Sequence, residues 1–188
     1  MAIADRELVL PGQGDQVTLQ GGVGVVFKVD GSLTSGRLAI VEHPVPLDAV
    51  VVPHSHTKED ELSYVLEGEI GVMIGDREFL APMGSYVFKP RGIPHAFWNN
   101  GRIPARLIEL IFPSGLEEGF REMATFNIDT ALAGPDAKRR MEISARYGTT
   151  PHFDLLPGFA QRHGIALPPG FARVVEASQK AGAKGMGV

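Results

Sequence analysis

Short apolar runs, separated by glycine and proline, follow one another from residue 7 to residue 112. They are rich in β-branched and aromatic residues, and none of them has a convincing helical period. Gly75 and Asp76 lie between two of the runs and fit a hairpin turn. Regular short strands with turn signals between them predict a sandwich or a barrel. The runs that we expect to be strands are 22–29, 36–45, 48–56, 61–69, 70–82 (two strands), 84–90, 94–101 and 105–113.

The apolar pattern becomes helical toward the C-terminus. Residues 114–126 have apolar positions at helical spacing, and Ser114 with Glu117 three residues later fits an N-cap. A second helical pattern covers residues 136–148, and a weak repeat of its end at residues 161–164 suggests another short helix. Both of these helices are expected to end at a glycine.

These patterns predict three parts. Residues 1–113 carry the strands, residues 114–175 form a helical extension, and residues 176–188 are a Gly/Ala/Lys-rich tail that we expect to be flexible. The extension is too short and too polar for a core of its own. We therefore expect it to pack on the β-domain or on a partner subunit.

Composition narrows the function classes. The 188-residue chain is 44% hydrophobic and has a net charge of −4 at pH 7, which gives no indication of nucleic acid or of an anionic membrane as a partner. Its apolar runs are far shorter than a membrane span, and its first residues lack a signal-peptide pattern. We therefore expect a soluble, cytoplasmic protein of one domain with an appendage.

Histidines dominate the candidate chemistry. The chain has no cysteine, so a bound metal must be held by nitrogen and oxygen. His54 and His56 are two residues apart in a strand-like run, so both imidazoles point to the same face. Glu61 follows after a short turn and can add a carboxylate oxygen. His95, behind a turn rich in proline and glycine, is the best candidate for a fourth ligand.

The segments around these residues resemble the paired motifs of the cupin superfamily, with nine of ten motif positions in agreement. The first motif is G-x5-H-x-H-x4-E-x6-G. Its matches here are His54, His56, Glu61 and Gly68, with Asp48 in place of the leading glycine. A turn position accepts Asp in a left-handed conformation. The second motif is G-x5-P-x-G-x2-H-x3-N, and it is matched by Gly84, Pro90, Gly92, His95 and Asn99.

This resemblance implies an all-β fold, an antiparallel jelly-roll barrel of roughly six to eight strands with the short C-terminal helical extension added to it. It also implies one divalent transition metal inside the barrel, either Fe, Mn, Ni, Cu or Zn. The implied ligands are His54, His56, Glu61 and His95. Such a donor set leaves room for water or substrate on the metal, and it does not select among these metals.

Strand alternation extends the site to its neighbours. The residues that share the parity of Glu61 and His95, and that we predict to contact substrate, are Ser63, Val65, Phe97 and Asn99. Trp98 then packs on the opposite face. Related small cupins often carry a bulky aromatic residue in place of Ser63, so a serine leaves space for a sizeable ligand unless another side chain fills it.

Several charged residues allow two interpretations. Glu109 interrupts an apolar run, and it either faces the lumen as a substrate-binding acid or lies exposed on the outer face, which is commoner for a strand glutamate. Glu42 and His43 pose the same alternative, because one of them must point to each face. Glu59 and Asp60 fit a solvated loop, and an acidic pocket rim is the alternative.

Within the superfamily, the segment EDELSYVLEGE (59–69) resembles bacterial quercetin 2,3-dioxygenase-like proteins most. This resemblance implies a metal-dependent dioxygenase acting on an aromatic or enol-containing small molecule, with Glu61 as the catalytic base. The alternatives are a non-catalytic cupin that binds a small molecule, and a metal-dependent isomerase or lyase. Jelly-roll proteins of this kind commonly pair through their sheets, so we also expect a homodimer.

Overall fold

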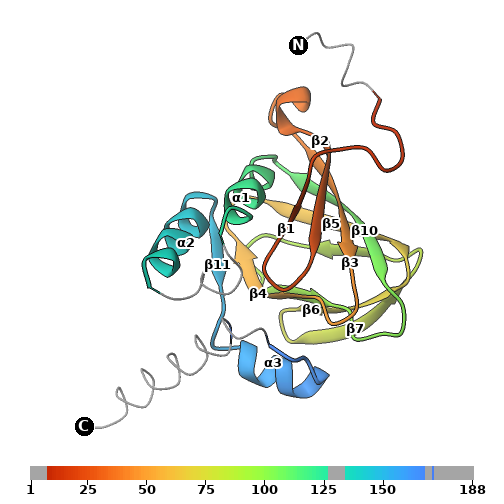
Figure 1. Cartoon of the computed structure of the whole chain (residues 1–188), viewed down its shortest axis with the longest axis vertical. Helices are drawn as coiled ribbons and strands as arrows, with labels where there is room; N and C mark the ends of the chain where they lie inside the picture. Colours follow the sequence, from red (N-terminus) through yellow and green to blue (C-terminus); the bar gives the residue numbers. More distant parts are fainter. Residues whose placement is uncertain (1–7, 127–133, 168–170, 172–188) are drawn as a thin grey trace.

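The computed structural model describes residues 8–126, 134–167 and 171 (Figure 1). Two antiparallel sheets form a jelly-roll barrel, and the helices follow it in the chain. The six-stranded sheet has the order β1 (Gln16–Thr18), β2 (Gly24–Val29), β3 (Ala39–Val45), β10 (Ala105–Phe112), β5 (Asp60–Glu67) and β8 (Tyr86–Lys89). The five-stranded sheet has the order β11 (Thr149–Pro151), β4 (Val50–His56), β9 (His95–Trp98), β6 (Glu69–Ile74) and β7 (Arg77–Pro82).

The expected strands are present, and the predicted fold class, an all-β jelly roll with a C-terminal helical extension, is confirmed. Each predicted run contains a strand whose ends differ by a few residues. The hairpin between β6 and β7 turns at Gly75, whose φ is 57°, and Ile74 pairs with Arg77 across it. Asp48 is left-handed at φ 62°, as its place in the motif requires. Sequence analysis missed the short strands β1 and β11.

Alternating side chains fill the inside of the barrel. Along β10, every second residue is buried, so that Leu107, Glu109 and Ile111 point inward. One core cluster lies inside the barrel and includes Val65, Leu107 and Phe97. The parity predicted for β5 and β9 is therefore what the sheets require, because a shift of one residue in the strand register would turn these apolar side chains outward.

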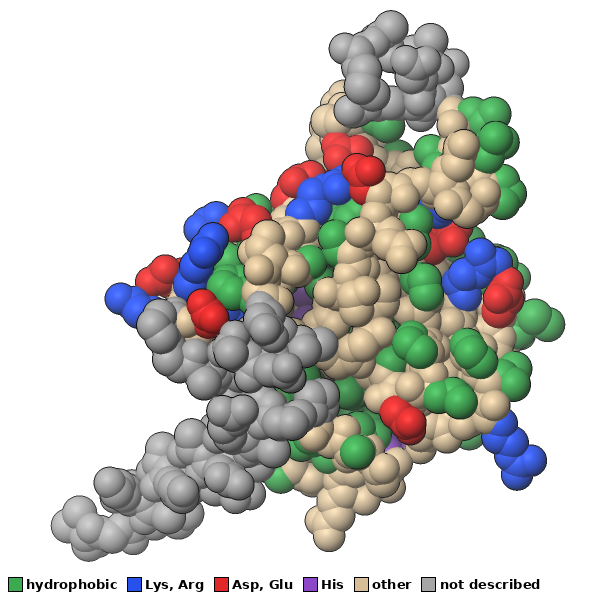
Figure 2. Space-filling model, in the orientation of Figure 1, with side chains coloured by type: hydrophobic (Ala, Val, Ile, Leu, Met, Phe, Trp, Pro, Cys, Tyr) green, Lys and Arg blue, Asp and Glu red, His purple; other side chains and the backbone are tan. Residues whose placement is uncertain are grey.

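The helical extension contains α1 (Leu116–Met123), α2 (Gly134–Arg146) and α3 (Leu156–His163), while a short 3-10 helix, η2 (Gly31–Thr34), joins β2 to β3. β11, which follows α2, pairs with β4 and so extends the five-stranded sheet. The glycines after α2 and α3 are left-handed, as predicted. Acidic and basic side chains lie intermixed over α1 and α2 on the face shown in Figure 2. The predicted tail, residues 176–188, lies outside the described residues.

The predicted N-cap at Ser114 is wrong. The N-cap residue is Gly115, whose φ of 133° suits glycine, and no side chain makes a cap hydrogen bond there. Instead, the Glu117 carboxylate accepts hydrogen bonds from the backbone N–H groups of Gly115, at 2.6 Å, and of Gly31, at 3.2 Å. A buried acid thus ties the start of α1 to η2.

An aromatic cluster holds α3 against the outer face of the five-stranded sheet. Trp98 is buried there with its ring 4.9 Å from that of Phe159, edge to face, and 4.1 Å from the imidazole of His163. A Cβ on Gly71 would lie 2.0 Å from the Trp98 ring, so only glycine leaves space for it. This places Trp98 on the face opposite the histidine ligands, as strand parity predicted.

Candidate metal centre

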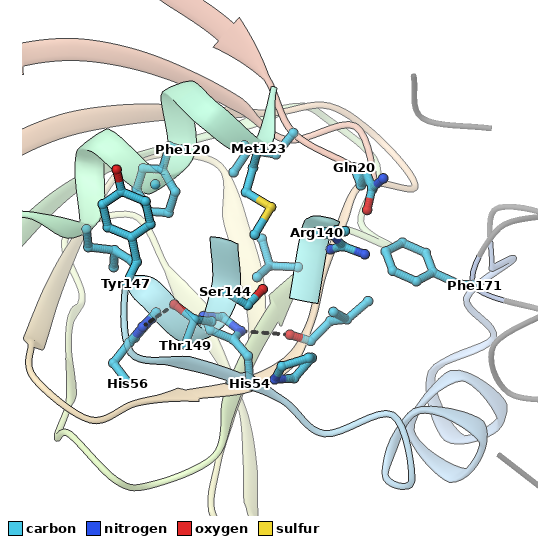
Figure 3. Close-up of a pocket in the computed structure, with 16 residues that line it drawn as sticks. Gln20, His54, His56, Phe120, Met123, Arg140, Ser144, Tyr147, Thr149 and Phe171 are labelled. Atoms are coloured by element: carbon cyan, nitrogen blue, oxygen red, sulfur yellow. Dashed lines mark hydrogen bonds between the residues drawn. The ribbon is translucent and has the colours of Figure 1, made fainter. Parts of the chain in front are cut away.

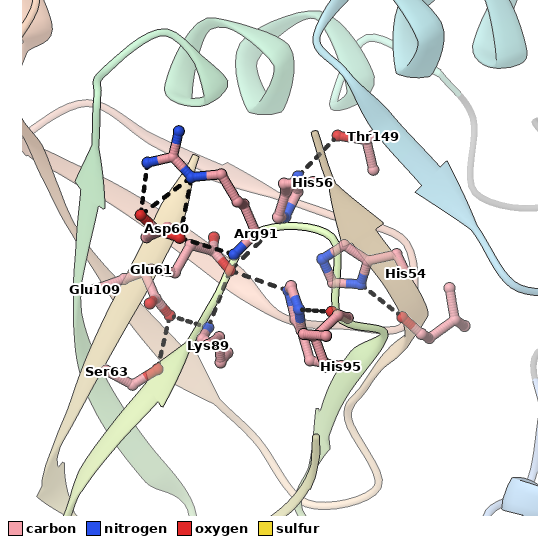
Figure 4. Close-up of polar contacts among 12 residues, drawn as sticks. His54, His56, Asp60, Glu61, Ser63, Lys89, Arg91, His95, Glu109 and Thr149 are labelled. Carbon is pink, nitrogen blue, oxygen red and sulfur yellow. Dashed lines mark hydrogen bonds and ion pairs between the residues drawn. The ribbon is translucent and has the colours of Figure 1, made fainter. Parts of the chain in front are cut away.

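Four side chains from three strands converge at one end of the lumen (Figure 4). His54 and His56 come from β4, Glu61 from the start of β5 and His95 from the start of β9. One nitrogen or oxygen of each lies within 4.8 Å of those of the others. Two ligands bound on opposite sides of an ion at about 2.0–2.2 Å would be roughly 4.4 Å apart. A contraction of a few tenths of an ångström would therefore let all four bind one ion.

Each imidazole has its Nδ1 already engaged. His54 and His95 donate from Nδ1 to the backbone carbonyl oxygen two residues earlier, at 2.8 and 3.0 Å. His56 Nδ1 lies 3.1 Å from the Thr149 hydroxyl on β11. These contacts orient the rings and leave the Nε2 lone pairs directed at the common centre, which is the usual arrangement of metal-bound histidines.

Burial keeps the imidazoles in the form that binds metals. It lowers the pKa of His54 well below its usual range and that of His56 to about 4. Neutral imidazole is the species that a metal binds. Burial alone would raise the pKa of Glu61, but Lys89 and His56 hold that pKa well below its usual range. The site therefore offers neutral nitrogens and an ionised carboxylate near neutral pH.

A buried ionic network lies directly beside the four side chains (Figure 4). Lys89 Nζ donates to Glu109 Oε2 at 2.8 Å and lies 3.2 Å from Glu61 Oε2. Ser63 donates from its hydroxyl to the same oxygen of Glu109, at 2.9 Å. Burial raises the pKa of Glu109 to about 7 against the opposing effect of Lys89. Burial opposes the charge of Lys89 too, but the two carboxylates more than offset it and raise its pKa. Lys89 can compensate only one of them.

The donor atoms fit a divalent cation. His56 Nε2 and His95 Nε2 are buried and have no hydrogen-bond partner among the described residues, while Glu61 Oε2 is buried beside Lys89 Nζ, at 3.2 Å. His95 Nε2 and Glu61 Oε2 lie 3.1 Å apart, so two acceptors face each other. Leaving buried polar atoms unpaired is costly. A cation at the centre would satisfy these atoms and would also offset the carboxylate charge that Lys89 leaves uncompensated.

A pocket of about 120 Å³ reaches His54 and His56 from outside the barrel (Figure 3). Its lining is mostly apolar and is shared between the barrel and the extension. The other lining residues are Leu19, Gln20, Val51, Val52, Leu116, Gly119, Phe120, Met123, Arg140, Ser144, Tyr147, Thr149, Pro151 and Phe171. A small molecule in this pocket would therefore contact two of the four candidate ligands.

The predicted substrate residues are all inside the barrel, but none lines this pocket. Ser63 hydrogen-bonds Glu109, while Val65 and Phe97 belong to the lumen core. The Asn99 side-chain amide donates to two backbone carbonyls, at 2.9 and 3.0 Å. Glu109 is 0% exposed, so its commoner placement on the outer face is wrong. The roles of these five residues as substrate contacts stay predictions, as does that of Glu61 as a base.

The other charged residues also have definite positions. His43 points inward and is 3% exposed, so Glu42 takes the outer side of β3. The solvated loop expected for Glu59 is wrong, because that residue is 3% exposed. The end of α2 covers its turn, where Lys58 donates to a backbone carbonyl of the helix terminus at 3.0 Å. Asp60 is half-buried and pairs with an arginine at 2.6 Å.

Sequence reasoning missed Lys89, Arg140 and Gln20. A signal existed for Lys89, which shares the parity of buried Val87 on β8 and is paired with Glu61 across the sheet. Arg140 and Gln20 lie in segments whose approach to the pocket depends on how the extension packs, and no local pattern marks them. Within the part of the chain that the structure describes, no helix is long and apolar enough to cross a membrane.

Part of the chain is similar to a known protein family. Residues 44–111 match the family model described as a cupin domain. An uncharacterized protein of Methanocaldococcus jannaschii is 25% identical over 77 residues, which are 41% of this chain and 62% of that relative. The match therefore spans less than two-thirds of that protein's length.

Solved structures share the fold. KdgF from Halomonas sp. superposes with a TM-score of 0.53 at 18% identity, over 60% of this chain and 99% of that chain. The polyketide cyclase RemF from Streptomyces resistomycificus has a TM-score of 0.51 at 25% identity, over 57% of this chain and 80% of that chain. These similarities agree with the jelly-roll topology. The names of these proteins describe their own activities and are not transferred to this chain.

Proposed function

We propose that the chain is a metal-dependent cupin enzyme that oxidises a small aromatic or enol-containing molecule with dioxygen. The observation that carries the proposal is the set of unpartnered, buried donor atoms beside a largely apolar pocket. Three imidazoles and a carboxylate suit first-row transition metals, several of which are redox-active. The resemblance of residues 59–69 to quercetin 2,3-dioxygenase-like proteins supports dioxygen chemistry in particular.

The side chains then have separate roles. His54, His56, Glu61 and His95 would hold the metal, and the metal would supply Lewis acidity and one-electron redox chemistry. Glu61 would accept the proton of the substrate hydroxyl. Lys89, 3.2 Å from Glu61, keeps that carboxylate ionised. Phe120 and Met123 shield the space over the histidines from water.

The pocket volume limits the substrate. A cavity of about 150 Å³ accommodates benzene, so the roughly 120 Å³ here suits a molecule of about one ring. A three-ring flavonol would need α1 and α2 to move outward. We therefore propose a substrate with a single ring, or an open-chain enol of similar size, that carries an acidic hydroxyl.

A second candidate is a non-oxidative isomerase, lyase or cyclase. The buried Lys89–Glu109 pair favours it, because these groups provide an acid and a base next to Glu61 without any need for oxygen. The similarity to a polyketide cyclase at 25% identity is a further argument for this class. A cupin that only binds its small molecule is the remaining alternative.

Metal reconstitution separates these candidates. Metal-free protein would be loaded separately with Fe(II), Mn(II), Ni(II), Cu(II) or Zn(II) and offered single-ring phenols and enols, with quercetin as the large comparison. We expect oxygen uptake in an electrode cell with at least one redox-active metal, and none with Zn(II) or with His95→Ala. Substrate loss without oxygen uptake would support the second candidate, and no turnover with any metal would leave a binding protein.

The homodimer belongs to the same proposal. Tyr86 and Phe88 on the outer face of β8 are 74% and 51% exposed, which is unusual for large aromatic residues on a sheet. A second copy of the chain could cover this face. The cytoplasmic location and the dimer both stay predictions.

A further inference from the structure

The pocket contains a cation for which the described residues provide no counter-ion. Arg140 projects from α2 into it, and its Nη1 is buried without a hydrogen-bond partner (Figure 3). Among the residues that the structure describes, no carboxylate forms an ion pair with this guanidinium. Burial lowers the pKa of Arg140 to about 10, so the group is still charged at neutral pH. The pocket is thus apolar apart from a permanent positive charge and a few polar groups.

A second unpartnered group lines the same pocket. Gln20, in the turn between β1 and β2, has both amide atoms buried, and neither has a hydrogen-bond partner within the described chain. Figure 3 draws Gln20 and Arg140 toward the Phe171 side of the pocket, and His56 toward Tyr147. The pocket therefore has a polar end in addition to the end that carries the candidate metal ligands.

The fold alone does not account for this arrangement. Buried charges in proteins are normally paired, because an unpaired one loses its hydration without compensation. The guanidinium carbon of Arg140 lies 5.9 Å from the centre of the Phe171 ring, a cation–π contact that is weak at this distance. By contrast, Arg139, the preceding residue on the same helix, is exposed to solvent.

We propose that the pocket's ligand carries a carboxylate, which binds Arg140 and Gln20 while the opposite end of the ligand faces His54 and His56. The planar guanidinium fork matches a carboxylate with two parallel hydrogen bonds, and the Gln20 amide adds a donor. This inference rests on the proposed function and narrows its substrate class to a single-ring or similarly small carboxylic acid with an enol or phenol oxygen.

Benzoate and benzamide provide the direct test, because they have nearly the same shape and differ in charge. Calorimetric titration of metal-free protein at pH 7.5 and about 0.15 M salt, where surface attraction is screened, would compare them. We expect wild type to bind benzoate at least tenfold more tightly than benzamide. Arg140→Met should lose this preference, Arg140→Lys should keep part of it, and the matched control Arg139→Met should retain all of it. Gln20→Leu should weaken benzoate binding several-fold.

Thermal stability without ligand gives a second, independent readout. Arg140→Met removes a partly buried charge that has no counter-ion among the described residues, so we expect its Tm to equal or exceed that of wild type, whereas a structural arginine would lower it on removal. Equal affinity for the two probes, binding of neither, or a preference that survives in Arg140→Met would overturn the inference. Metal-free protein is used because failure of metal binding, which would remove the proposed function, leaves this titration unchanged.

Discussion

Protonation of His43 should make the protein acid-labile over a defined pH range. This imidazole is 3% exposed, donates from Nδ1 to the Gly24 carbonyl oxygen at 2.9 Å, and has the rings of Phe97 and Phe120 about 6 Å away. Burial lowers its pKa from 6.5 to about 4, a lowering to which Lys89 adds. The native state therefore stays unprotonated in a range where the unfolded chain takes up a proton.

The sign and size follow from this difference. Between pH 6.5 and about 4 the unfolded state binds more protons, so the free energy of unfolding falls as the pH falls. A separation of about 2.5 pKa units at 1.36 kcal/mol each gives a total of about 3 kcal/mol, of which about 2 kcal/mol is lost between pH 7 and pH 5. For a chain of this length, that loss lowers Tm by roughly 4–8 °C.

The assay is urea unfolding of metal-free wild type and His43→Asn at pH 7 and pH 5. Asparagine keeps a donor near the position of Nδ1 but does not titrate, so it lowers stability at both pH values and removes this residue's share of the pH dependence. We expect wild type to lose about 2 kcal/mol more than the variant between the two pH values. Because His54 and His56 also titrate in both proteins, only this difference is informative. Parallel losses would refute the reasoning.

Three further outcomes follow from the site and the surface. His95→Ala should lower metal affinity at least about 100-fold, as measured by equilibrium dialysis with elemental analysis. The control His163→Ala should leave the affinity unchanged. Unchanged affinity in His95→Ala would contradict the ligand assignment. Lys89→Met should lower the unfolding free energy of metal-free protein by about 3 kcal/mol, and adding Glu109→Leu should recover most of it; a fully stable single variant would contradict the charge argument. Tyr86→Lys should convert the predicted dimer to a monomer by light scattering, and an unchanged mass would exclude this face.

Local patterns were sufficient for strands β2 to β10 and for the four candidate ligands. His54 and His56 share a face because strand side chains alternate, and the next turns bring Glu61 and His95 to neighbouring positions. The same parity placed Trp98 on the outer face. The positions of these side chains are set by contacts between paired strands. The register of those strands follows from the turns and from the apolar face that must be buried.

The misses depend on packing between segments that are distant in the chain. Glu59 is buried in a turn whose neighbouring residue, Lys58, contacts the end of α2 at Arg146, 88 residues further along the chain. Lys89 is buried because Glu61 and Glu109, on other strands, face it. Its local sequence, a lysine after Phe88, would by itself suggest an exposed edge strand. Arg140 has no counter-ion in the described part of the chain, so the expectation that a partly buried charge has a partner does not locate it in the pocket.

The extension forms part of the wall over the candidate metal centre. The candidate ligands all lie within residues 44–111, the part that matches the cupin domain. The pocket over them is different, because Phe120, Met123 and Arg140 come from α1 and α2, beyond that match. A protein that shares only the barrel lacks this wall. Selectivity for the proposed substrate would therefore depend on residues of the extension, above all on Arg140, which has no counter-ion among the described residues.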